Sequence, residues 1–186
     1  MNKLLFIVFF IVSFISTDNN IEASGKFITR QGQISFFSYT NVENIEAKNN
    51  QVLSIIDLSK NEIAISMLMN AFVFEKALMR DHFNESYIES DLYPKATFEG
   101  EIIGFDPNTH EDQTKLIKGK ITIREITKDI EVKVKIDYNE GKYVFNGSFE
   151  LVVQDFKIKI PPILAPNIAK TISVQFKFEY QPYELS

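Results

Sequence analysis

Uninterrupted alternation between apolar and polar residues constrains the fold of this sequence more than any other feature. Residues 128–138 and 170–180 each place five apolar side chains at every second position. Because successive side chains of a strand point to opposite faces, each run predicts a strand with one buried face and one face in water. Such one-sided strands are typical of antiparallel sheets. Weaker alternation brings the expected total to about eight strands and covers residues 33–39, 51–58, 62–69, 96–105, 116–124 and 142–153.

Breaks in this rhythm predict the turns and one helix. Asn139-Glu140-Gly141 is a hairpin signal, and Asn146-Gly147 indicates either a second turn or a bulge. Residues 74–88 are rich in helix formers with one apolar stripe, so we expect a short helix or two helical turns ending near Asp91, before Pro94. One-sided strands with a single helix predict an antiparallel sandwich or barrel with a helical cover. Side chains fill the interior of an eight-stranded barrel, or it holds one small ligand.

The first 23 residues have the pattern of a secretory signal peptide. Met1-Asn2-Lys3 is a positive start, and an apolar run follows over residues 4–15. A membrane-spanning helix needs about 20 apolar residues, so this run is short for one. We expect cleavage after Ala23, with an uncleaved N-terminal anchor as the alternative. Residues 24–186 are then expected to form one exported β-barrel domain without a stable membrane span.

Composition excludes several classes of function. The 186 residues include no cysteine, which rules out disulfides, thiolate metal sites and cysteine nucleophiles. The formal net charge of −5 argues against nucleic acid as a partner, because nucleic-acid binding needs a concentrated basic surface. The 17 phenylalanines predict either a heavily packed core or the lining of an apolar cavity.

A long central run identifies a resemblance to a known family. Residues 74–100 contain, in order, His82-Phe83, Tyr87, an acidic stretch, Tyr93-Pro94, Thr97-Phe98 and Gly100. This order resembles the signature of the YceI-like family, in the version found in exported proteins of Bacteroides-type bacteria. Further similar segments span nearly the whole expected mature chain and cover residues 32–38, 44–47, 155–161 and 168–170. One departure is Glu125, which stands where the family usually has a turn glycine.

The resemblance implies an all-β, antiparallel, lipocalin-like barrel of about eight strands with one short covering helix. Better-studied members of the family hold a long isoprenoid-type chain in an apolar interior. The expected function is therefore to hold an apolar small molecule, such as an isoprenoid or fatty-acyl lipid, for storage, transport or sensing. The expected location is the periplasm or the medium of a Gram-negative-type bacterium. The alternative is a packed barrel without a ligand that acts through protein–protein contacts.

Inward-facing apolar residues are the candidate ligand contacts, because an apolar chain needs dry surface rather than directed hydrogen bonds. A tail of several hundred Å² would gain roughly 5–10 kcal/mol before ordering costs. The ten candidates are Phe36, Ile65, Met67, Met69, Phe72, Phe83, Phe98, Ile102, Phe149 and Phe176. Their alternative role is simply to fill the core.

No catalytic residue, metal ligand or cofactor is predicted. Asp81, His82 and Glu85 could share a helix face, which makes a metal site or a hydrolase conceivable. However, no ligand spacing such as His-Glu-x-x-His is present. We expect His82 to anchor the helix near the barrel rim. The acidic residues Glu85, Glu89 and Asp91 are expected to form a solvated face. The apolar, proline-rich segment 160–166 is expected to be a lip at the barrel mouth or a rigid crossover.

Overall fold

The structure is a computed structural model that describes residues 25–39, 44–109, 111–160 and 169–183. Its described strands are β1 (Lys26–Ser38), β2 (Ile45–Asp57), β3 (Glu62–Leu68), β4 (Val73–Phe74), β5 (Lys95–Ile103), β6 (Gln113–Ile123), β7 (Ile126–Asn139), β8 (Lys142–Val152) and β9 (Thr171–Pro182). Its described helical segments are the 3-10 helices η1 (Met69–Ala71) and η3 (Val153–Phe156), the α-helix α1 (Ala77–His82) and the π-helix η2 (Phe83–Tyr87). The proline-rich residues 161–168 and the expected signal peptide lie outside the described residues.

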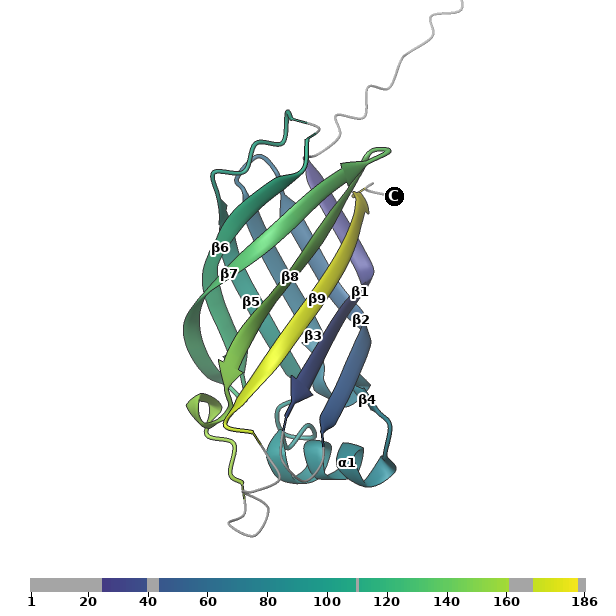
Figure 1. The fold of residues 1–186 in the computed structure, drawn as a ribbon, viewed down its shortest axis with the longest axis vertical. Coiled ribbons are helices and arrows are strands. Elements are labelled where there is room, and N and C mark those ends of the chain that lie inside the picture. Colours follow the sequence, from purple (N-terminus) through teal and green to yellow (C-terminus); the bar gives the residue numbers. More distant parts are fainter. Residues whose placement is uncertain (1–24, 40–43, 110, 161–168, 184–186) are drawn as a thin grey trace, which may run out of the picture.

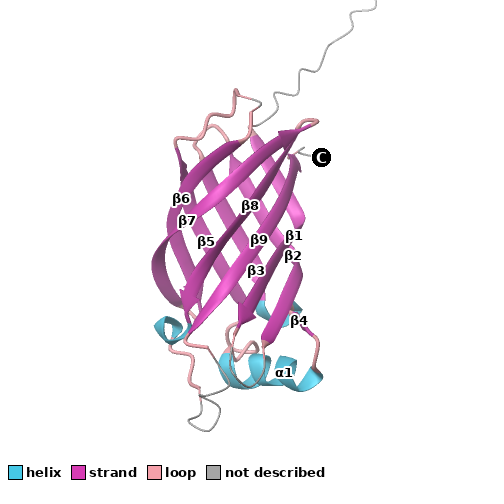
Figure 2. Ribbon diagram, in the orientation of Figure 1, coloured by secondary structure: helices cyan, strands magenta, loops and turns pink. Residues whose placement is uncertain are grey.

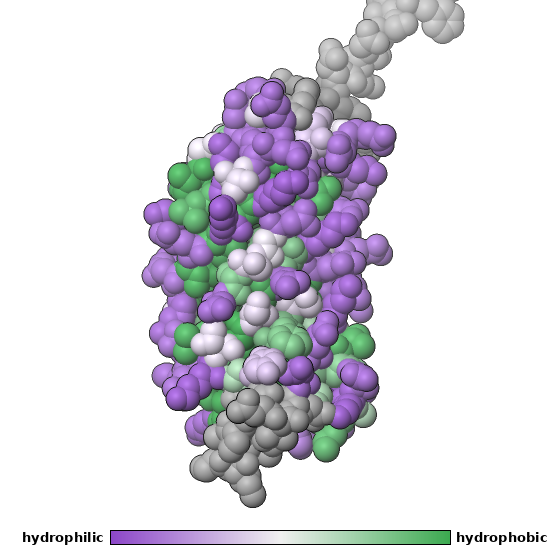
Figure 3. Space-filling view, viewed as in Figure 1, coloured by the Kyte–Doolittle hydropathy of each residue, from purple (hydrophilic) through white to green (hydrophobic). Residues whose placement is uncertain are grey.

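Eight of the described strands close into an antiparallel barrel. They follow one another around the wall in the order β1, β2, β3, β5, β6, β7, β8 and β9, and β9 pairs again with β1. Figures 1 and 2 show these slanted strands with α1 at one end. Figure 3 shows many hydrophilic side chains on the face turned toward the viewer, with apolar and neutral ones between them. The predicted eight-stranded barrel with one short covering helix is confirmed.

The two ends of the barrel differ. At one end lie α1 and the rest of residues 69–94, which we call the cap, together with the turn between β6 and β7 (Figure 1). At the other end lies the hairpin turn between β7 and β8. We call these the cap end and the turn end. The Glu140-Gly141 pair forms the latter turn with positive φ angles of 50° and 79°, between partners Asn139 and Lys142. This confirms the predicted hairpin turn.

At the cap end, β2 separates from β3. The β2–β3 ladder runs only from Asp57 to Leu53, and the earlier part of β2 pairs instead with β4. The fully buried side chain of Asn49 bridges the split: its amide donates to the Leu68 carbonyl oxygen at 2.9 Å, and its Oδ1 accepts from the Gln51 N–H at 2.9 Å. The wall at this point therefore continues through η1 and β4, which brings cap residues into the barrel lining.

Two sequence predictions about local structure are wrong. Asn146-Gly147 is neither a turn nor a bulge, because both residues keep regular register inside β8 with partners on β7 and β9. The predicted helix over residues 74–88 begins later, since Phe74 belongs to β4 and α1 starts at Ala77. Pairing of β4 with the released part of β2 takes precedence over local helix propensity. The helix also changes from α to π at Phe83, a change often found at functional sites.

Candidate functional site

A cavity of about 410 Å³ occupies the cap half of the barrel. Its walls come from the inward-facing residues of the strands and from η1, β4, α1 and η2. The exposed cap residues Lys76 and Leu78 are among its lining residues, so the cavity reaches the surface beside α1. This volume lies in the range typical of small-molecule sites, which are concave and mostly apolar.

Nine of the ten predicted contact residues line this cavity. They are Phe36, Ile65, Met67, Met69, Phe72, Phe83, Phe98, Phe149 and Phe176. The tenth, Ile102, is not a lining residue and belongs to the packed core instead. It faces inward with only 1% exposure, but it lies near the turn end of β5, beyond the point where the cavity stops. Alternation identified its face correctly and gave no information about its depth along the barrel.

Four phenylalanine rings form the wall between the barrel and the cap. Phe36 of β1 contacts Phe72, Phe74 and Phe83, with ring centroids 5.4, 5.9 and 5.7 Å apart. Phe83 of η2 also lies 5.6 Å from Phe72 and 5.0 Å from Phe74. We call these four residues the mouth cluster. Because three of its rings come from the cap, the cap packs onto the barrel through residues that also line the cavity.

Glycine positions let two other phenylalanine rings lie close against the barrel wall. An added Cβ at Gly119 would approach the Phe98 ring to 2.6 Å, and one at Gly147 would approach the Phe176 ring to 2.5 Å. Both distances are too short for a real side chain. Because glycine has no side chain, Gly119 and Gly147 leave room for these rings beside the backbone. This explains why Gly147 stands inside a regular strand.

Aromatic side chains fill the turn half of the barrel. Phe145 contacts Tyr180 and Phe105, with ring centroids 5.1 and 6.3 Å apart, and Tyr143 contacts Phe105 at 5.7 Å. We define the aromatic plug as Phe27, Phe105, Tyr138, Tyr143, Phe145 and Tyr180, which are linked by such ring contacts. None of these six residues lines the cavity.

A buried hydrogen bond holds the plug to the wall. The Tyr180 and Ser54 hydroxyl oxygens are 2.6 Å apart, and Ser54 Oγ donates to the Ala64 carbonyl oxygen at 3.0 Å. Ser54 has one hydroxyl proton, so its oxygen accepts the proton of Tyr180. Tyr180 is fully buried, and this burial raises the pKa of its hydroxyl well above the usual range.

Polar side chains of the lining are concentrated at the cap end. Ser38 ends β1, Lys76 precedes α1, His82 ends α1, and Tyr87 ends η2. The His82 and Tyr87 rings meet edge to face with centroids 6.5 Å apart. Partial burial raises the pKa of the Tyr87 hydroxyl, so it stays protonated near neutral pH.

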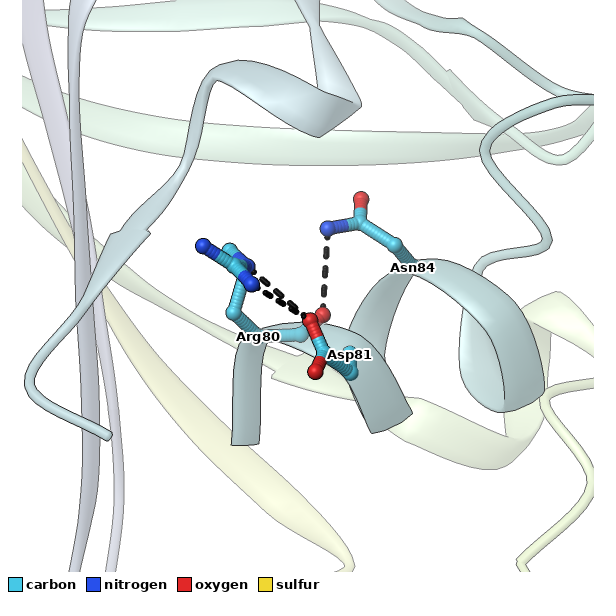
Figure 4. Close-up of polar contacts among 3 residues, drawn as sticks. All are labelled: Arg80, Asp81 and Asn84. Carbon is cyan, nitrogen blue, oxygen red and sulfur yellow. Dashed lines mark hydrogen bonds and ion pairs between the residues drawn. The ribbon is translucent and has the colours of Figure 1, made fainter. Parts of the chain in front are cut away.

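The helix residues considered for metal binding or hydrolysis do not form a site together. Asp81 pairs with its neighbour Arg80, whose Nε and Nη2 lie 3.0 and 2.8 Å from Asp81 Oδ1 (Figure 4). Asn84 donates to the Arg80 carbonyl oxygen, and Glu85 is exposed. In the described part of the chain, no group of three or more His, Asp or Glu side chains is arranged to hold a metal ion.

A charged contact joins the cap to the barrel rim. The Arg124 guanidinium donates to the Glu89 carboxylate and, at 2.7 Å, to the Lys157 carbonyl oxygen, and it lies over the Tyr93 ring at 5.1 Å. The Arg124 side chain is only 11% exposed. Glu89 is therefore not part of a solvated acidic face, as the sequence suggested. Its partner is 35 residues away, so local charge pattern gave no sign of it.

Sequence reasoning missed several lining residues. Ile34, Phe74, Val132, Val174 and Phe178 line the cavity without having been proposed as contacts. Val132, Val174 and Phe178 share the inward parity of the two strongest alternating runs, so the same signal could have included them. Phe74 could not be found this way, because its place depends on β4 pairing with β2.

These features define a class of protein: a small antiparallel barrel with an apolar cavity under a helical cap. The YceI-like domain model matches residues 13–180, so the chain belongs to the YceI-like family. The resemblance seen in the sequence is thereby confirmed. No curated protein matches the chain.

Solved structures show the same fold at low sequence identity. A polyisoprenoid binding domain from Saccharophagus degradans, implicated in plant cell wall breakdown, has a TM-score of 0.73 and 11% identity, covering 86% of this chain and 99% of its own. BcnA of Burkholderia cenocepacia has a TM-score of 0.67 and 16% identity, with coverage of 80% and 95%. The YceI protein of Campylobacter jejuni has a TM-score of 0.64 and 16% identity, with coverage of 78% and 90%. Among the described residues, no helix is both long and apolar enough to span a membrane.

Proposed function

We propose that this protein binds a lipid with an apolar chain, of the isoprenoid or fatty-acyl class, inside the cap half of its barrel. The observation that carries the proposal is the cavity of about 410 Å³, whose wall is almost wholly apolar below the cap end. Burial of hydrocarbon supplies the affinity, at about 0.8 kcal/mol for each CH₂ group before ordering costs. Met67 and Met69 suit such a wall because flexible thioether side chains adapt to irregular ligands.

Two further points support a binding role. The similar Saccharophagus degradans domain is described as polyisoprenoid binding, and the present chain shares its fold. In addition, the cap packs on the barrel through rings that line the cavity, so the cap would cover a bound chain. The role outside the cytoplasm remains part of the proposal and rests on residues 1–23. Mass spectrometry of the protein recovered from the periplasm or the medium should give the mass of a chain that begins at Ser24.

Extraction and titration test the binding proposal together. Organic extraction of the purified protein with mass analysis should release an apolar-chain lipid. The extracted protein should then bind a fluorescent fatty acid with saturable, one-to-one stoichiometry. If no lipid is released and the probe does not bind, the barrel is a ligand-free module that acts by protein contact, and the proposal fails.

A pair of variants on β3 makes the test specific to the cavity. Ile65→Asp places a carboxylate on the dry wall, where an unpaired charge is strongly disfavoured, so probe binding should fall at least tenfold. Ala64→Asp places the same group on the exposed outer face of the same strand and should leave binding unchanged. Equal binding by both variants would place the probe outside the cavity.

A further inference from the structure

The cavity stops halfway along the barrel. On β7, Ile130 and Val132 line it, whereas the next inward residue, Val134, does not. On β9, the lining ends at Phe178, and Tyr180 lies beyond it. The same boundary falls on β5 and β8, where inward residues near the turn end pack into the core instead. A chain that enters from the cap end therefore meets a floor.

The floor is rigid. Phe178 is 1% exposed, and its ring stacks on Phe176 with centroids 5.3 Å apart. Beneath it, Tyr180 and Phe145 are fully buried, and Tyr180 is hydrogen-bonded to Ser54. A longer ligand could advance only by displacing these rings and leaving a buried hydroxyl without its partner, which is unfavourable.

The volume above the floor limits the length of the chain. An apolar cavity of roughly 150 Å³ holds one benzene molecule, so about 410 Å³ corresponds to a chain of about 15 to 20 carbon atoms. That is three to four isoprene units, or one fatty-acyl chain of ordinary length. The polar lining residues lie at or near the cap end, so a polar head group would stay there while the tail points to the floor; they are Ser38, Lys76, His82, Tyr87 and, near the start of β5, Thr97.

We propose that the aromatic plug sets an upper limit on ligand length, so that the protein selects single-chain amphiphiles with tails of about 15 to 20 carbons. This inference rests on the proposed function, and it adds a selectivity that the fold alone does not imply. The selectivity resides in the position of Phe178 and the plug along the barrel, not in the chemistry of the wall.

A chain-length series tests the limit. Extracted protein loaded with the fluorescent fatty acid is titrated with prenyl alcohols of two to eight isoprene units and with saturated fatty acids, each presented from cyclodextrin to prevent aggregation. Affinity should rise up to three or four isoprene units and then fall, with the eight-unit alcohol at least tenfold weaker than the four-unit alcohol. Equal or tighter binding of the eight-unit alcohol would overturn the length limit. Failure of every compound, and of the probe itself, would instead overturn the proposed function.

A matched pair of variants locates the limit at the floor. Val132→Phe adds a ring at the deep end of the cavity and should shift the preferred length down by about one isoprene unit. Val152→Phe makes the same change at an exposed position on β8 and should leave the preference unchanged. An unchanged preference in Val132→Phe would show that length is not read at the floor. The wild-type series decides the proposal on its own if Val132→Phe does not fold.

Discussion

The two halves of this barrel are built from the same strands and are filled differently. On β8, Tyr143 and Phe145 pack inside the turn half, whereas Phe149 and Leu151 line the cavity in the cap half. All four side chains face inward in one alternating run. The strand pattern thus determines which face is buried, but the sizes and contacts of the side chains determine whether the interior is solid or hollow.

Ring contacts account for the difference. In the turn half, the six rings of the aromatic plug contact one another in a continuous series, and none of them lines the cavity. In the cap half, many lining residues are aliphatic, and the rings of Phe98 and Phe176 lie close against glycine backbone on the inner side of the wall. Side chains of this half leave a cavity of about 410 Å³ between them.

The largest expected effect is a difference in stability loss between two phenylalanine-to-alanine variants on β8, one in each half of the barrel. Phe145→Ala should lower the free energy of unfolding by about 3–5 kcal/mol, because a fully buried ring leaves a cavity in packed surroundings. Phe149→Ala should lower it by only about 1–2 kcal/mol, since that ring already borders a cavity. Urea denaturation measures both. Equal losses would mean that the cap half is as tightly packed as the turn half.

At the rim of the cap half, we expect an ion pair to contribute to stability, whereas in the turn half the contribution comes from packed rings. Glu89→Gln should lower the free energy of unfolding by about 2 kcal/mol, because it leaves the largely buried Arg124 without its carboxylate. The control is Glu131→Gln, which breaks a pair with Lys118 whose side chains are both more than half exposed; its loss should be below about 0.5 kcal/mol. Similar losses in the two variants would show that the Arg124 contact does not fasten the cap.

The sequence could predict features that depend on neighbouring residues, and it could not predict features that depend on contacts between residues far apart in the chain. Alternation is local, so it predicted the strands and the inward face of seven of the nine lining residues, all except Phe72 and Phe83. Depth along the barrel is not local: Ile102 has the right parity and still lies in the core. Gly147 was interpreted as a turn or bulge signal. A glycine is needed there because the Phe176 ring of another strand lies against it, and the local sequence does not show that contact. The Glu89–Arg124 pair was invisible for the same reason.

The plug also gives the turn half a pH dependence, because Tyr180 can ionise. The folded state raises the pKa of Tyr180, so this residue's contribution to stability is complete below about pH 10, the ordinary tyrosine value, and is lost as the pH rises further. Tyr180→Phe should lower the free energy of unfolding by about 1 kcal/mol at neutral pH, through loss of the hydrogen bond to Ser54.

Above pH 10, Tyr180→Phe should lose stability less steeply than the wild type. Tyr143, whose pKa is also raised mainly by burial, remains in both proteins, so the difference between the two curves isolates Tyr180. Urea unfolding between pH 7 and pH 11 measures this slope. Parallel curves would show that Tyr180 ionises as readily in the folded protein as in the unfolded chain.

The smallest effect compares the turns at the two ends. Each is a two-residue turn with both central residues at positive φ, but the second residue is Gly141 at the turn end and Glu125, with φ 61°, at the cap end. Left-handed backbone is unfavourable for a residue with a side chain, and glycine adopts it freely. Glu125→Gly should therefore raise the free energy of unfolding by about 0.5–1 kcal/mol, and Gly141→Glu should lower it by a similar amount. If Glu125→Gly instead destabilises the protein, the side chain of Glu125 makes a contribution at the rim that outweighs its backbone strain.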